Sequence, residues 1–128
     1  MILDTSAIVA IATEEPGCLD LIDKLNDAPT LGIGAPTLVE TALVLRSRLT
    51  SEPRAFLERF LSDWNVTVVP FGEDHWKAAA EAHTRYGRGR HKAALNFGDC
   101  LSYATAKLAD MSLLCTRADF AKTDLTIA

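Results

Sequence analysis

Four carboxylates in this chain lie in segments where acidic side chains are unusual. Asp4 directly follows the first three residues, MIL, and Asp119 lies three residues past the apolar segment SLLCT. Glu40 and Asp99 each lie between apolar residues, in PTLVETALVL and FGDCLSYATA. An acid near a helix start is usually only a cap or a dipole partner. Glu40 and Asp99 are harder to explain in that way, because burial of an uncompensated carboxylate is strongly unfavourable.

A cluster of these acids would need a positive partner. Two carboxylates about 4 Å apart repel by roughly 4 kcal/mol at an effective dielectric constant of 20. Bound protons or a divalent cation must offset that repulsion, and an all-oxygen site suits Mg²⁺ or Mn²⁺ rather than Zn²⁺. A divalent cation held by acids indicates phosphoryl chemistry. The three histidines are not spaced as HExxH, and we interpret them as ordinary exposed or half-buried side chains.

A basic segment, RYGRGRHK at residues 85–92, contrasts with the net charge of −4. It holds four of the thirteen Lys and Arg residues and no acid: Arg85, Arg88, Arg90 and Lys92. Such a segment either is a solvated loop or holds the phosphate backbone of a nucleic acid. Tyr86 within it could stack on a base or serve a structural role.

The apolar pattern predicts short strands that alternate with helices. We expect strands at 1–3, 31–35, 66–71 and 112–116, and a further terminal strand at 125–127. We expect helices at 6–15 (with Ser6 as the cap), 18–26, 53–63, 73–87 and 97–110, another that opens at Pro36, and a helical turn at 117–124. This order indicates an α/β fold with a parallel sheet and helices on both faces. The four acids lie near strand C-termini or helix N-termini, so they can converge at one end of that sheet.

Length and composition indicate one globular domain. The chain has 128 residues, 48% of them hydrophobic, and no apolar run long enough to cross a membrane. The first residues resemble a strand and carry no basic leader, which argues against a secretory signal. The three cysteines form no CxxC pair, and we interpret them as reduced thiols of a cytoplasmic protein.

The sequence resembles the PIN-domain ribonucleases, and more narrowly the VapC-type toxins of bacterial toxin–antitoxin pairs. The segments that carry the resemblance are MILDTSAIVAI, APTLVETALVL, LNFGDCLSYATAKLA and LLCTRADFAKTDL. DTSA alone is weak, but the last two segments in this order are specific. The resemblance covers the chain end to end. It therefore implies a single PIN domain at residues 1–128, a three-layer α/β/α fold with a short, mostly parallel sheet of four to five strands.

The resemblance also implies a set of metal-binding acids. Asp4, Glu40 and Asp99 match the three central acids of the family, and Asp119 matches the fourth. Many relatives have another acid or an asparagine at the position of Ala118. Asp124 is a further acid nearby, which we interpret as a structural or capping residue. The expected reaction is hydrolysis of RNA with one or two Mg²⁺, with Mn²⁺ as the expected substitute.

Supporting residues and partners follow from the same resemblance. Ser6 and Thr116 match hydroxyl positions that could bind metal-coordinated water, and Asn96 matches a polar residue that orients Asp99 or fixes the turn. Family members cut structured RNAs such as tRNA or ribosomal RNA loops and usually form homodimers. A small antitoxin protein binds the active-site groove and often places an arginine among the acids, where a guanidinium bridges carboxylates.

Two alternatives remain open on the sequence. The first is a PIN fold that only binds and no longer catalyses, which should show no stabilisation by Mg²⁺ or Mn²⁺. The second is a doubly wound phosphoryl-transfer domain, since such proteins also place an aspartate after the first strand. That class requires further acids near Asp4 or a lysine after a late strand, and this chain has Ser6 and Arg117 at those positions.

Overall fold

The central sheet confirms the expected architecture. The computed structural model describes residues 1–128 and contains one four-stranded parallel sheet in the order β3-β2-β1-β4. Its strands are short: β1 (Ile2–Leu3), β2 (Gly32–Gly34), β3 (Thr67–Val69) and β4 (Leu113–Leu114). In the register, Ile2 of β1 pairs with Gly32 on one side and with Leu113 on the other. The strands β2 and β4 therefore lie on opposite sides of β1, and this reversal of strand order is the topological switch point where α/β sheets bind ligands.

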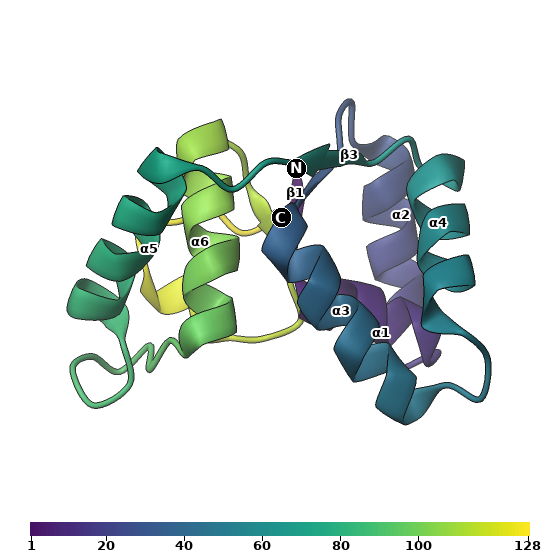
Figure 1. Ribbon diagram of the computed structural model, residues 1–128, viewed down its shortest axis with the longest axis horizontal. Helices are drawn as coiled ribbons and strands as arrows, with labels where there is room; N and C mark the ends of the chain where they lie inside the picture. The colour runs from purple at the N-terminus through teal and green to yellow at the C-terminus, as the bar shows by residue number, and fades with distance from the viewer.

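Helices cover both faces of the sheet, as the sequence predicted (Figure 1). One group lies on the right in that view and the other on the left. The right-hand group comprises α1 (Thr5–Ala12), α2 (Cys18–Asp27), α3 (Ala35–Arg48) and α4 (Pro53–Asp63). The left-hand group comprises α5 (Glu73–Tyr86) and α6 (Phe97–Ala109), and a 3₁₀ turn follows at Phe120–Lys122.

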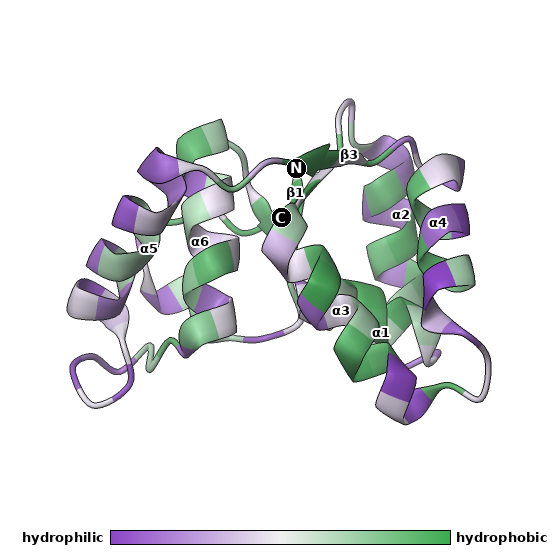
Figure 2. Cartoon of the chain, in the orientation of Figure 1, coloured by the Kyte–Doolittle hydropathy of each residue, from purple (hydrophilic) through white to green (hydrophobic).

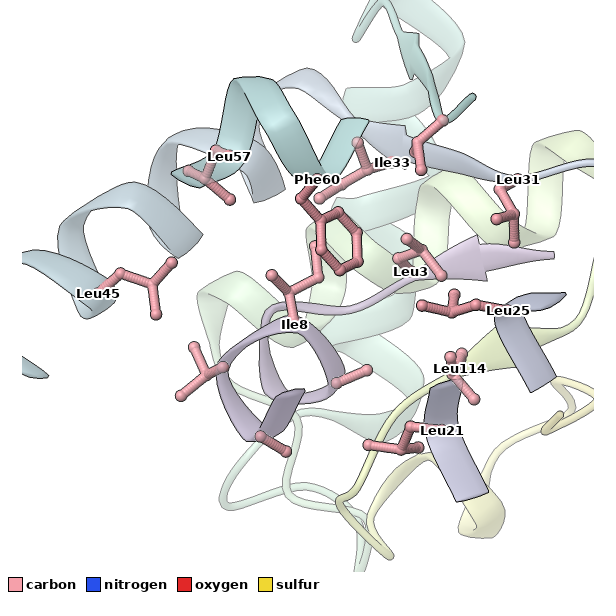
Figure 3. Packing of buried hydrophobic residues seen from close by; sticks show 14 residues of the cluster. Leu3, Ile8, Leu21, Leu25, Leu31, Ile33, Leu45, Leu57, Phe60 and Leu114 are labelled. Atoms are coloured by element: carbon pink, nitrogen blue, oxygen red, sulfur yellow. The ribbon is translucent and has the colours of Figure 1, made fainter. Parts of the chain in front are cut away.

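Two apolar clusters hold these layers together. On one face, Leu3, Ile8 and Phe60 belong to a cluster contributed by the sheet and by α1–α4 (Figure 3). On the other face, Ile2 and Phe120 belong to a cluster with residues of α5 and α6. Hydropathy colouring shows α1 as predominantly apolar and the outermost helix, α5, as predominantly hydrophilic (Figure 2). The adjacent residues of β1 point to opposite faces of the sheet, as the strand repeat requires.

Two sequence predictions differ from the structure, and an alternative left open is decided. The first helix begins at Thr5 with Asp4 as its cap, not at Ser6 with Ser6 as the cap. The segment 125–127 contributes only an isolated bridge between Leu113 and Ile127, so no regular fifth strand forms. Tyr86 is 9% exposed and packs against His91 and Tyr103, so it is not available to stack on a base and is structural.

The cysteines agree with the sequence interpretation. All three are free thiols, and Cys100 is buried. Burial raises the pKa of both Cys100 and Cys115 to about 11, so these thiols remain protonated at neutral pH. None of the helices combines the length and the apolar character that crossing a bilayer would need.

Candidate active site

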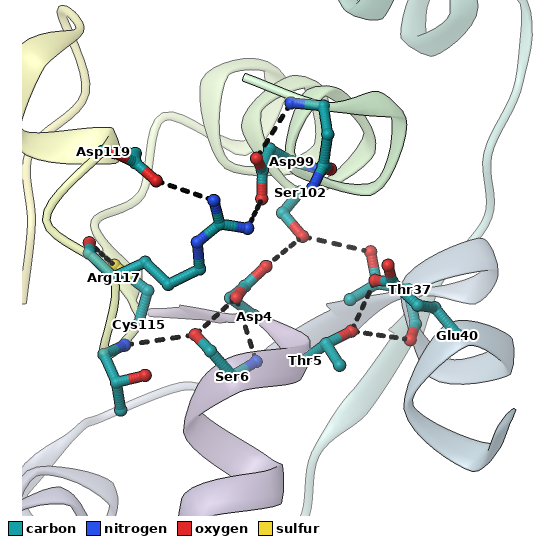
Figure 4. A network of polar contacts seen from close by, with 12 residues as sticks. Asp4, Thr5, Ser6, Thr37, Glu40, Asp99, Ser102, Cys115, Arg117 and Asp119 are labelled. Atoms are coloured by element: carbon teal, nitrogen blue, oxygen red, sulfur yellow. Dashed lines mark hydrogen bonds and ion pairs between the residues drawn. The ribbon is translucent and has the colours of Figure 1, made fainter. Parts of the chain in front are cut away.

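Asp4 is held at the carboxyl end of β1 by three donors. Its backbone is extended and ends the strand, and its side chain caps α1. One carboxylate oxygen accepts hydrogen bonds from Ser6 N and Ser6 Oγ at 3.0 and 2.6 Å. The other accepts from Ser102 Oγ of α6 at 2.7 Å (Figure 4). Asp4 is only 4% exposed, so these donors are what makes burial of its carboxylate tolerable.

Asp99 lies beside Asp4, on the first turn of α6. It forms a capping box with Asn96: Asn96 N donates to Asp99 Oδ2 at 2.9 Å, and Asp99 N donates to Asn96 Oδ1 at 2.9 Å. Asp99 Oδ1 faces Arg117 Nη1 at 3.0 Å. Burial raises the pKa of Asp99, the charge of Asp4 raises it further, and the Asn96 N–H and Arg117 act in the opposite direction.

Arg117 links Asp99 to Asp119. It follows β4, and its guanidinium donates Nη1 to Asp99 Oδ1 and Nη2 to Asp119 Oδ2, the latter at 2.7 Å (Figure 4). Lys122 adds a weaker contact to Asp119 at 3.6 Å. The hydrogen bond from Arg117 lowers the pKa of Asp119. The cation that offsets these acids in the structure is therefore an arginine of the same chain.

Glu40 lies on α3, across from Arg117 in the view of Figure 4. Its Oε2 accepts a hydrogen bond from Thr5 Oγ1 at 2.7 Å, and Thr41 Oγ1 in turn donates to Thr5 Oγ1 at 3.1 Å. The carboxylate lies directly against Gly98 of α6: a Cβ atom there would lie 2.9 Å from Glu40 Cδ and closer still to one oxygen. The position of Glu40 thus depends on the absence of a side chain at residue 98.

These segments meet in one small cleft. Asp4, Glu40 and Asp99 line a cleft of about 170 Å³ together with Arg48 and Arg117. The acids come from residues far apart in the sequence, and the parallel sheet brings them together. However, no group of three or more acidic, histidine or cysteine side chains is arranged to hold a metal ion in this geometry. Each carboxylate is instead occupied by hydroxyl, amide or guanidinium donors.

The supporting residues of the sequence analysis also lie here. Ser6 Oγ accepts from Thr116 N at 3.1 Å while it donates to Asp4, and Asn96 fixes Asp99. Thr116 contributes its backbone N–H to this contact. Sequence reasoning missed Thr5 and Ser102, both of which touch an acid. A signal for Ser102 existed, because it lies one helical turn after Asp99 on the same face.

Asp124 lies outside the cleft. Its carboxylate accepts hydrogen bonds from Tyr103 Oη at 2.7 Å and Lys107 Nζ at 2.9 Å. Burial opposes ionisation here, but the bonds from Lys107 and Tyr103 prevail and lower the pKa of Asp124 to about 2. These contacts give Asp124 a structural position that ties the C-terminal segment to α6.

Asp124→Asn should therefore reduce stability without changing the cleft. The native pKa lies below the ordinary 3.8, so the ionised carboxylate stabilises the fold above about pH 4, and this contribution is lost as the pH falls toward 2. The side chain is 36% exposed, so we expect a loss below about 1 kcal/mol at pH 7. Thermal unfolding should show a lower Tm at pH 7 and a smaller difference from wild type at pH 3. A difference that widens on acidification would contradict this interpretation.

Comparison with known proteins identifies the family and the fold. The PIN domain family model matches residues 1–124, a range that includes all four candidate acids. The chain belongs to the PIN-domain family. Ribonuclease VapC36 of Mycobacterium tuberculosis is 43% identical to it over 126 residues, which cover 98% of this chain and 91% of that protein. This relationship places the chain among VapC-type PIN domains.

Solved structures give the same fold. VapC20 of Mycobacterium tuberculosis, a sarcin–ricin loop-cleaving toxin, superposes with a TM-score of 0.81 at 17% identity, covering 99% of this chain and 97% of VapC20. VapBC2 of Rickettsia felis, bound to promoter DNA, superposes with a TM-score of 0.74 at 18% identity, covering 99% of this chain and 96% of the matched one. The PIN assignment rules out the doubly wound phosphoryl-transfer domain considered from the sequence.

Proposed function

We propose that this VapC-type PIN domain is a Mg²⁺-dependent endoribonuclease that acts in the cytoplasm as the toxin of a toxin–antitoxin pair. The observation that carries the proposal is the pair of buried carboxylates, Asp4 and Asp99, side by side at the switch point of the sheet. The charge of Asp4 raises the pKa of Asp99, and buried carboxylates placed beside one another are costly for a fold and typical of catalytic sites. The named ribonuclease relative at 43% identity supports the same activity.

The cleft suits a divalent cation by the chemistry of its donors. Asp4, Glu40 and Asp99 would hold Mg²⁺ or Mn²⁺, with Asp119 as a fourth acid, since hard cations prefer carboxylate oxygens. The guanidinium of Arg117 already occupies a cation position between Asp99 and Asp119. When bound, the cation would lower the pKa of a coordinated water and offset charge on the leaving oxygen of the phosphodiester.

The remaining residues of the site hold these acids in place. Ser6 and Ser102 orient Asp4, the backbone N–H of Asn96 orients Asp99, and Thr5 orients Glu40. Rotamers fixed in this way keep carboxylate oxygens directed into the cleft, which is the positioning that phosphoryl chemistry requires.

Sequencing of RNA ends after expression of the chain tests the proposal. Discrete new ends that require the wild-type chain and disappear with Asp99→Ala or with EDTA are the expected result. An Asp99→Ala chain that produces the same ends would refute the proposal. The alternative of a non-catalytic PIN module predicts no new RNA ends and no thermal stabilisation by Mn²⁺.

The basic segment is the proposed RNA-binding element. It begins in the last turn of α5 and runs toward α6, so it ends four residues before Asn96 of the candidate site. All four basic residues are exposed, but Arg85 also stacks on Tyr86 and donates to its hydroxyl at 3.0 Å. We propose that these four basic side chains hold phosphates of the RNA, with Arg85 the least free to do so.

A double substitution, Arg88→Ser with Arg90→Ser, should weaken RNA binding without sequence preference. The logarithm of the RNA-binding constant decreases with the logarithm of the salt concentration, and each lost phosphate contact reduces the steepness of this decrease by about one. The double substitution should therefore reduce the steepness by about two. Binding is measured at several salt concentrations in the Asp99→Ala background, where RNA stays intact. Arg54→Ser on α4, which removes an arginine paired with Glu58, is the control. An unchanged slope in the double variant would exclude the segment from the interface.

The partners we propose are a second copy of the chain and a small antitoxin protein that covers the active-site cleft. An apolar groove of about 930 Å³ lies between α3 and the helices α5 and α6, and Glu40 and Gly98 form part of its wall. Its lining includes several large exposed apolar side chains: Val39, Leu43, Trp76 and Phe97. An exposed patch of this kind marks an interaction site. We assign it to the homodimer, which would place two clefts near one interface.

Leu43→Glu should convert the dimer to a monomer. Leu43 is 59% exposed, so the substitution leaves the core intact but places a charge in the proposed interface. Light scattering coupled to size exclusion should give the mass of one chain instead of two. Leu19→Glu on α2 is the matched control, because Leu19 is 71% exposed and lies outside the groove. If Leu43→Glu and Leu19→Glu have the same mass in solution, the groove is not the dimer interface.

A further inference from the structure

Arg117 makes two ion pairs, with Asp99 and Asp119, that the proposed catalytic role of these acids does not explain. Its guanidinium bonds simultaneously to Asp99 Oδ1 and Asp119 Oδ2, two of the four acids assigned to the metal site (Figure 4). Arg48 also lines the cleft, but its guanidinium pairs with Glu15 at 3.2 Å. Among the arginines of the cleft, only Arg117 bonds to candidate ligands.

We infer that Arg117 is an intramolecular competitor of the divalent cation, which holds the site closed until its guanidinium is displaced. The inference rests on the proposed function and adds a regulator to the same site. A guanidinium and a divalent cation repel each other, and we expect a cation to bind Asp99 Oδ1, the oxygen that Arg117 holds and that Asn96 N does not. The two cannot occupy that oxygen together, so the chain stabilises its own metal-free state.

The surroundings of Arg117 allow its side chain to leave without a rearrangement of the backbone. The segment after β4 is anchored by Thr116 N, which donates to Ser6 Oγ at 3.1 Å, and by Cys115 Sγ, which contacts the carbonyl of Arg117 at 3.6 Å. The side chain of Arg117 is 37% exposed, whereas that of Asp99 is 5% exposed. The guanidinium therefore has solvent on one side, and rotation of its side chain suffices to uncover Asp99.

Closure by Arg117 has a thermodynamic consequence. The apparent affinity of a ligand is reduced by the fraction of molecules in the competent state. Removal of the guanidinium should raise cation affinity and, in the absence of metal, should lower stability because Asp99 and Asp119 lose their shared counter-ion. A residue with a purely structural role would change stability but not cation affinity.

Titration of Mn²⁺ into the full-length chain by calorimetry tests the inference. Arg117→Gln should bind Mn²⁺ about tenfold more tightly than wild type, within the usual range of coupling between two sites. Arg117→Lys should fall between them, because an ammonium keeps the charge but not the two-pronged geometry. Arg48→Gln is the matched control: it removes the same charge from the same cleft without touching Asp99 or Asp119, and its affinity should stay near that of wild type.

The outcomes separate the inference from the proposed function. Equal Mn²⁺ affinity in wild type, Arg117→Gln and Arg117→Lys would overturn the inference and leave the metal site standing. An equal gain in Arg48→Gln would also overturn it, because the effect would then be general electrostatics. Absence of Mn²⁺ binding in every variant would instead refute the metal site. If Arg117→Gln does not fold without metal, the comparison of wild type with Arg117→Lys decides the question.

Discussion

Asp4→Asn is expected to reduce RNA cleavage by at least about 10³-fold while the chain remains folded. Loss of a ligand to the catalytic cation removes several kcal/mol of transition-state stabilisation, and each 1.36 kcal/mol is tenfold in rate. Asparagine is as good a helix cap as aspartate, and its carbonyl still accepts from Ser6 N. Ser6 Oγ can still donate to that carbonyl, and the hydroxyl of Ser102, which faces the other oxygen of Asp4, can rotate to accept from the new amide N–H. Single-turnover cleavage at saturating Mn²⁺ measures the effect.

The control for Asp4→Asn is the same substitution at an exposed acid. Asp23 lies on the solvent side of α2, and Asp23→Asn should cleave at the wild-type rate. Circular dichroism and Tm establish that both variants are folded. Wild-type cleavage by a folded Asp4→Asn chain would mean that the carboxylate after β1 is only a helix cap.

The course of the backbone was largely readable from the sequence. Short apolar runs alternating with helical periods predicted four parallel strands and helices on both faces, and the structure has both. The sequence also predicted that the acids converge, because parallel strands end at one edge of a sheet. The structure places Asp4, Glu40 and Asp99 in one cleft. These features depend on the backbone and on topology, which local patterns specify well.

The identity of each acid's partner was not readable in this way. The sequence argument anticipated protons or a metal as the offset for the clustered charge, whereas the structure supplies Arg117. A long side chain reaches any of several acids, and its choice depends on packing between distant segments. The cap of α1 was misplaced for a related reason: Asp4 and Ser6 both suit a cap, and only the end of β1 decides between them.

Gly98→Ala should impair cleavage through Glu40, with an expected loss on the order of 10²-fold. A methyl group at residue 98 would overlap the Glu40 carboxylate, which is the flexible end of its side chain, so Glu40 should rotate away rather than distort the fold. Its bond from Thr5 Oγ1 would be lost with the cleft position. Loss of a positioned charge in an active site typically costs 10² to 10³ in rate.

Gly98→Ala should lower the rate of cleavage without lowering the stability of the fold. Alanine favours a helix over glycine by about 0.5–1 kcal/mol, and residue 98 lies in the first turn of α6. Gly98→Ala should therefore retain or slightly exceed the wild-type Tm while cleavage and Mn²⁺ affinity fall. Gly72→Ala is the matched control, because a Cβ there meets nothing within 4 Å. Full activity of Gly98→Ala would show that Glu40 need not occupy its place against α6, and would remove it from the set of metal-binding acids.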